Sequence, residues 1–193
     1  MPISTIDSTG LSSPLTGATL SGPTISGAVV SAMASSVITS GTAVASTSGT
    51  SIDFTGIPSW VKRITVMFSG VSTSGTSNQI IQIGSGSFTA TGYLGTCSNV
   101  ATASASSTQM STGFMVGTGA AAAALYHGSV VLTLINASTN SWSENGSLGR
   151  SDGSLGYFSA GSIALSGTLD RVRITTVNGT DTFDAGSINI LYE

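Results

Sequence analysis

The chain has 193 residues, of which 7% are charged and 40% are hydrophobic, and its formal net charge is −3. Ordinary soluble domains carry about 25% charged residues, whereas disordered chains are poor in apolar residues and rich in charge or proline. This composition therefore excludes a disordered chain and indicates closely packed β layers and contacts between chains, where a buried charge would be costly. Nucleic acid and membrane insertion are not expected, because the basic residues form no run: Lys62, Arg63, Arg150, Arg171 and Arg173.

The first 48 residues contain one charge, Asp7, and no aromatic residue. Within them a five-residue repeat begins with Leu-Thr-Gly-Ala-Thr and continues with Leu-Ser-Gly-Pro-Thr. A period of five fits neither a helix nor a flat strand, and its Ser-Gly pairs disfavour a helix interior. We predict an extended, intertwined stalk, with a flexible linker as the alternative. The apolar residues that would form the stalk core are Leu15, Leu20, Ile25 and Val30.

From about Thr50 the sequence changes to short alternating segments separated by Gly, Ser and Asn. Alternation of apolar and polar residues is typical of strands. Segment 129–135 is almost continuously apolar and is expected to be buried on both faces, whereas 98–107 has no clear period. Asn178-Gly179 is typical of a hairpin turn, and Gly146 and 70–77 indicate further turns. Predicted strands cover 61–68, 79–83, 88–94, 110–116, 129–135, 140–145, 157–165, 170–177 and 187–192.

About eight short strands without an amphipathic helix predict an all-β fold. We expect an antiparallel, jelly-roll-like β-sandwich head over 49–193, preceded by an attachment region over 1–48. Trp60, Phe68 and Phe183 are expected in its core, and Cys97 is expected to be a small buried apolar residue.

The residues that could carry catalysis are few. His127 is the only histidine and Cys97 the only cysteine, so neither a zinc site nor a disulfide can be built from them. We expect His127 at a surface or interface, not in a Ser-His-Asp triad. Asp181 and Asp184 could place two carboxylates on one loop, but capping of a turn explains them better. The sequence predicts no enzyme, no metal and no cofactor.

One cluster has the composition of a sugar-binding surface. An aromatic face can stack on a sugar ring while neighbouring polar groups bond its hydroxyls. The alternative is a hairpin with one buried tryptophan. The predicted glycan contacts are Trp142, Glu144, Asn145, Arg150 and Asp152.

Two segments resemble a known family. Thr-Gly-Ile-Pro-Ser-Trp-Val-Lys-Arg-Ile-Thr-Val-Met-Phe (55–68) and Leu-Asp-Arg-Val-Arg-Ile-Thr-Thr-Val-Asn-Gly-Thr-Asp-Thr-Phe-Asp-Ala-Gly-Ser-Ile-Asn-Ile-Leu-Tyr-Glu (169–193) are similar to tailed-bacteriophage fibre-type structural proteins. The resemblance implies a homotrimer whose slender N-terminal part attaches to other virion proteins and whose β-sandwich faces outward, toward host surface glycans.

The expected function is that of a virion structural protein, a short fibre with a head that contacts the host. The N-terminus has no basic region followed by an apolar run, so we expect no signal peptide and synthesis in the host cytoplasm. A capsid decoration or cement protein is the alternative, and a glycan-degrading enzyme is a more distant one.

Overall fold

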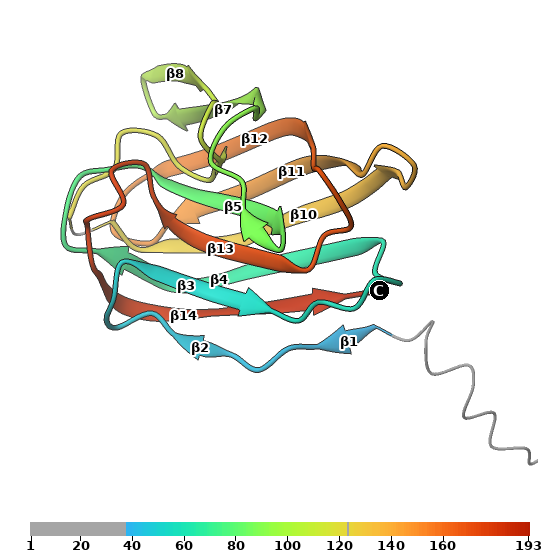
Figure 1. Ribbon diagram of the computed structural model, residues 1–193. Helices are drawn as coiled ribbons and strands as arrows, with labels where there is room; N and C mark the ends of the chain where they lie inside the picture. Colours follow the sequence, from blue (N-terminus) through green and yellow to red (C-terminus); the bar gives the residue numbers. More distant parts are fainter. Residues whose placement is uncertain (1–37, 123) are drawn as a thin grey trace, which may run out of the picture. The chain divides into compact units, whose positions relative to one another are not determined.

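The computed structural model describes residues 38–122 and 124–193. The chain divides between Ala34 and Ser35, and all described residues belong to the second part. They form two antiparallel sheets packed face to face (Figure 1). The prediction of an all-β sandwich is confirmed.

The larger sheet has nine strands, in the order β1-β14-β4-β10-β11-β12-β7-β8, with β2 also paired to β14. Its hairpins β10–β11 and β11–β12 form a meander of long strands at the centre. The strands are β1 (Thr39–Ser40), β2 (Val44–Ala45), β4 (Arg63–Thr73), β7 (Leu94–Ala101), β8 (Ser104–Gln109), β10 (Tyr126–Asn136), β11 (Ser141–Arg150), β12 (Leu155–Ala164) and β14 (Phe183–Tyr192).

The smaller sheet has five strands, in the order β3-β13-β5-β6, and β9 pairs with the same strand β5. Its central strand β13 is bonded on both sides, by β3 and β5. The strands are β3 (Ser51–Thr55), β5 (Gln79–Ser85), β6 (Ser87–Phe88), β9 (Phe114–Met115) and β13 (Arg171–Thr176).

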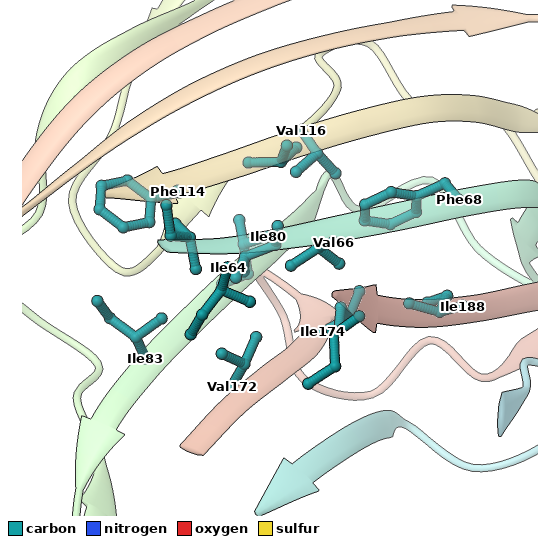
Figure 2. Close-up of a cluster of buried hydrophobic side chains, with 14 of the residues drawn as sticks. Ile64, Val66, Phe68, Ile80, Ile83, Phe114, Val116, Val172, Ile174 and Ile188 are labelled. Atoms are coloured by element: carbon teal, nitrogen blue, oxygen red, sulfur yellow. The ribbon is translucent and has the colours of Figure 1, made fainter. Parts of the chain in front are cut away.

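The core lies between the two sheets and follows directly from the alternation in the sequence. On β4 the side chains of Ile64, Val66 and Phe68 point inward, and on β13 Val172 and Ile174 face them (Figure 2). Each of these five side chains is at most 5% exposed. Burying an aliphatic or aromatic side chain contributes about 1.5–3 kcal/mol, so this layer explains why a chain so poor in ionic groups folds.

The structure corrects several predicted strands. Segment 129–135 is not buried on both faces: in β10, Val130 and Leu132 are buried, while Thr133 is exposed. Segment 98–107 has no clear period, yet it contributes to the β7–β8 hairpin, because cross-strand bonding does not require an apolar face. Gly146 is not a turn, since β11 continues through it to Arg150.

Three other segments also differ from prediction. Asn178-Gly179 is not a tight hairpin, because β13 and β14 lie in different sheets and the loop crosses between them. Of segment 110–116, only Phe114–Met115 is a strand. Of segment 88–94, only the two ends are in strands, in β6 and β7.

Predicted turn 70–77 is shortened because β4 runs on to Thr73 past a bulge. At that bulge the pairing of β14 with β4 shifts register between Ala185 and Ser187. Gly186 lies there with φ +88°, and a Cβ at this position would be 2.3 Å from the Gly70 carbonyl oxygen. A glycine is therefore required where the two strands bend together.

The region predicted for attachment overlaps the head. Strands β1 and β2 fall within residues 1–48, and they pair with β14 through Thr39 opposite Tyr192 and Val44 opposite Ile188. The last residues of this region thus complete the edge of the larger sheet. The predicted stalk core of Leu15, Leu20, Ile25 and Val30 lies outside the described residues.

Candidate functional site: the outer surfaces of the sandwich

The most distinctive surface is the outer face of β10, β11, β12, β7 and β8, which we call the uncharged face. Strand register places its residues in four rows across the sheet, and none is Lys, Arg, Asp or Glu. The rows are His127, Gly149, Gly156, Val100 and Ala105; Ser129, Ser147, Phe158, Ser98 and Ser107; Val131, Asn145, Ala160, Thr96 and Gln109; and Thr133, Ser143, Ser162 and Leu94.

Three large apolar side chains of this face are open to solvent. Leu94 is 69% exposed, Phe158 55% and Val100 50%. Gly156 separates two of them: it lies opposite Val100 in the register, and a Cβ built on Gly156 would be 3.7 Å from the Phe158 ring. Exposed apolar groups without charged neighbours favour contact with another macromolecule.

The outer face of the smaller sheet has a different character. There Arg173 donates two hydrogen bonds to Asp53 across the β13–β3 pair, at 2.8 and 2.7 Å. Its guanidinium also lies 4.0 Å from the centre of the Phe88 ring, and the neighbouring Arg171 pairs with Asp170 at 2.7 Å. These charges satisfy one another, so this face is a closed ionic network.

An aromatic pair marks the edge where the chain passes from β3 to β4. The ring centres of Trp60 and Tyr192 are 5.8 Å apart, and Trp60 is 36% exposed. The prediction of Trp60 in the core is therefore wrong, because the turn holds it outside the sandwich, whereas Phe68 and Phe183 are buried as predicted. Tyr192 also borders a groove of about 340 Å³ that is lined in part by Thr42, Asp53 and Thr55.

The structure separates the predicted glycan contacts. Trp142 is 2% exposed and Glu144 3% exposed, both on the inner side of β11. The alternative, a hairpin with one buried tryptophan, describes Trp142. Asn145 lies on the opposite side of the same strand, on the uncharged face, with its Nδ2 3.5 Å from the Ser159 carbonyl oxygen. Alternation along one strand thus sends these neighbours to different faces.

The other two predicted contacts form an ion pair at the far end of β11. Arg150 donates its Nε hydrogen to Asp152 Oδ1 at 3.1 Å, and the same oxygen accepts the Leu125 backbone N–H at 2.9 Å. The Arg150 hydrogen bond, more than any other contact, lowers the pKa of Asp152 well below its ordinary value. The pair holds the loop after β11 against the segment that precedes β10. That these residues contact a glycan stays a prediction.

Glu144 is an ionisable group inside the sandwich. Its Oε1 accepts the Ser159 hydroxyl at 2.6 Å, while its Oε2 has no hydrogen-bond partner among the described residues. Burial raises the pKa of Glu144 from 4.5 to about 7, and the Ser159 bond acts in the opposite direction. Burial, and to a smaller extent the Glu144 charge, also raises the pKa of Cys97 to about 12, which disfavours the reactive thiolate. Cys97 is fully buried, as predicted for a small apolar residue.

His127 is exposed, as predicted for a surface histidine. Its Nδ1 accepts the Gly70 backbone N–H at 3.2 Å, so the proton of the neutral ring is on Nε2, which lies 3.1 Å from Ser151 Oγ. A general base must accept the serine proton at that nitrogen. With this tautomer Nε2 donates to the Ser151 hydroxyl, the reverse of the transfer that a general base makes.

Asp181 caps a turn, in agreement with the sequence interpretation. Its Oδ2 accepts the Ser77 N–H at 2.9 Å and its Oδ1 accepts the Asn178 side-chain amide at 2.7 Å. Among the described residues, no three His, Cys, Asp or Glu side chains gather in a way that could hold a metal ion. That part of the chain also lacks any helix long and apolar enough to cross a membrane.

Comparison with known proteins finds no match to this chain among family models, curated proteins or solved structures.

Proposed function

We propose that this protein is a non-enzymatic structural protein of a phage virion, a trimeric fibre whose β-sandwich head contacts the host surface. The first 48 residues serve attachment and trimerisation, although β1 and β2 at the end of this region also pair with β14 of the head. The head is jelly-roll-like. The jelly-roll architecture is used by viral capsid and lectin domains. The observation that carries the proposal is the order in which the strands of the head are arranged.

In an eight-stranded jelly roll, numbered along the chain, one sheet has the order 1-8-3-6 and the other 2-7-4-5. In the head, β3, β4 and β5 correspond to strands 1 to 3, β7, β8 and β9 to strands 4 to 6, the meander β10–β11–β12 to strand 7, and β13 to strand 8. The order 1-8-3-6 is then the order β3-β13-β5-β9 of the smaller sheet. The order 2-7-4-5 is that of the larger sheet, where β4 is followed by the meander and then by β7 and β8. Strands β14, β1 and β2 extend that sheet beyond β4. This correspondence supports a jelly-roll-like head with an expanded seventh strand.

Two surface features support the proposed roles. The uncharged face suits contact with neighbouring protein subunits, since no ionic groups need to be desolvated. The exposed Trp60 lies beside Tyr192, which borders a groove lined in part by the hydroxyls of Thr42 and Thr55. An aromatic face next to hydroxyl groups has the composition of a sugar-binding surface. A host glycan is therefore the expected ligand of the head.

Immunogold labelling of the virus particles tests the location. We expect label at the tail, and purified protein should compete with particles for adsorption to host cells. Label spread over the whole capsid would instead favour a decoration or cement protein, which the breadth of the uncharged face also supports. Particles without label would contradict both. Cleavage of host polysaccharide by the purified protein would contradict a non-enzymatic role.

A further inference from the structure

We infer that the uncharged face, together with the free edge of β8, is a contact surface for a second copy of this chain. The inference rests on the proposed function in assigning an assembly of identical chains. It goes further by placing a chain-to-chain contact in the head itself, separate from residues 1–48.

The first observation is the edge of the larger sheet. All six residues of β8 are exposed, and within residues 38–122 and 124–193 its only strand partner is β7. Natural sheets protect such edges with charged residues, proline or bulges, and the sequence Ser-Ala-Ser-Ser-Thr-Gln contains neither a charge nor a proline. At the top of Figure 1 the β7–β8 hairpin forms the end of the sheet. This edge is open to another strand.

The unpaired backbone groups of β8 can be identified. Met110 N–H donates to the Gly95 carbonyl oxygen at 2.9 Å, and in an antiparallel pair every second residue bonds toward its partner strand. The backbone groups of Ala105, Ser107 and Gln109 therefore point away from β7. A strand added at this edge would bond to these three residues.

The second observation is that the uncharged face adjoins this edge. Val100 and Phe158 lie on β7 and β12, the first strands inward from β8, and both are half exposed. Serine, alanine and glycine fill most of the remaining positions, so a second surface can approach closely. A single partner can cover both the edge and the apolar side chains beside it.

The absence of charge identifies the partner. A highly charged surface placed on this face would lose hydration without gaining an opposite charge. The suitable partner is equally uncharged and brings its own unpaired strand edge, and a second copy of this chain supplies both. A self-complementary contact of one patch with its copy is two-fold, so it would pair a head with the head of a second trimer and would not itself build the trimer proposed above.

The test uses the full chain and two matched variants. Ser107→Lys places a charge on the exposed edge of β8, and Ser48→Lys makes the same change in the exposed bend between β2 and β3. Hydrogen–deuterium exchange of the Ala105, Ser107 and Gln109 amides is the deciding measurement, at micromolar protein. Sedimentation of the same samples gives the mass.

In the wild type and in Ser48→Lys we expect these amides to exchange at least tenfold more slowly than unstructured amides. In Ser107→Lys we expect them to exchange at the unstructured rate. Free exchange in the wild type, or equal protection in Ser107→Lys, would overturn the inference. In that case an oligomeric mass would be due to contacts elsewhere, and the virion proposal would stand. If Ser107→Lys abolishes the protection but antibody against the protein labels no virus particle, this contact would stand and the virion proposal would be contradicted.

Discussion

Glu144 shows how a single buried group makes the whole molecule sensitive to pH. The residue is 3% exposed, and one carboxyl oxygen is bonded to Ser159 while the other has no partner in the described structure. Burial raises its pKa from 4.5 to about 7. Between these two values the folded protein keeps a proton that the unfolded chain has lost, so stability falls as pH rises.

We predict that the contribution of Glu144 to the free energy of unfolding is largest below pH 4.5. This contribution falls by about 3 kcal/mol as the pH rises above 7. Glu144→Gln keeps the shape and the Ser159 contact but cannot ionise, so this part of the pH dependence should disappear. Urea unfolding at several pH values measures it. Asp184→Asn, at an exposed carboxylate of β14, is the control. An unchanged slope in Glu144→Gln would refute the assignment.

At the scale of the element, the bulge at Gly186 decides the course of β14. The residue has φ +88°, and a Cβ there would be 2.3 Å from the Gly70 carbonyl oxygen, which belongs to the backbone and cannot turn away. The two strands would have to separate at the point where they bend. Since β14 contributes the buried Phe183, Ile188 and Ile190, its displacement would disturb the core.

We therefore predict that Gly186→Ala destabilises the head by more than 2 kcal/mol, since a strained φ and a steric clash add. Gly153→Ala is a suitable control, because a Cβ there would have no contact closer than 4.0 Å and φ is not in the left-handed region. Thermal unfolding followed by circular dichroism compares the two. Equal melting temperatures would show that the bulge tolerates a side chain.

At the scale of the whole molecule, the place where the head begins determines what a truncation does. The chain divides between Ala34 and Ser35, and β1 and β2 pair with β14. Removal of residues 1–34 leaves these pairs intact, whereas removal of 1–48 takes both strands away. The second deletion exposes the edge of β14 and part of the groove beside Tyr192.

We predict that deletion of 1–34 leaves the melting temperature of the head unchanged, and that deletion of 1–48 lowers it by several degrees, as expected for about 1 kcal/mol in a domain of this size. Differential scanning calorimetry measures both. If the protein forms the proposed trimer through the N-terminal repeat, light scattering should show a smaller mass for both truncations. A head that melts equally in both would mean that β1 and β2 add no stability.

Much of this protein could be predicted from the sequence, because strand alternation is a local property. Ile64, Val66 and Phe68 identify an inward face without knowledge of the partner strand, and the lack of charge predicts sheets packed on one another. Asp181 and Cys97 could be assigned because turn capping and the burial of a small thiol depend mainly on their near neighbours.

Only the tertiary structure decided which residues share a surface. Trp60 and Trp142 each lie near polar residues in the sequence, yet one is at the surface against Tyr192 and the other is buried. The uncharged face gathers residues from β10, β11, β12, β7 and β8, segments that span residues 94–164. The sequence itself determined the two-layered β fold, because the alternation of apolar and polar residues along each strand depends only on neighbouring positions in the chain. The faces, edges and loop crossings depended on which strands are neighbours, and this is set by long-range packing.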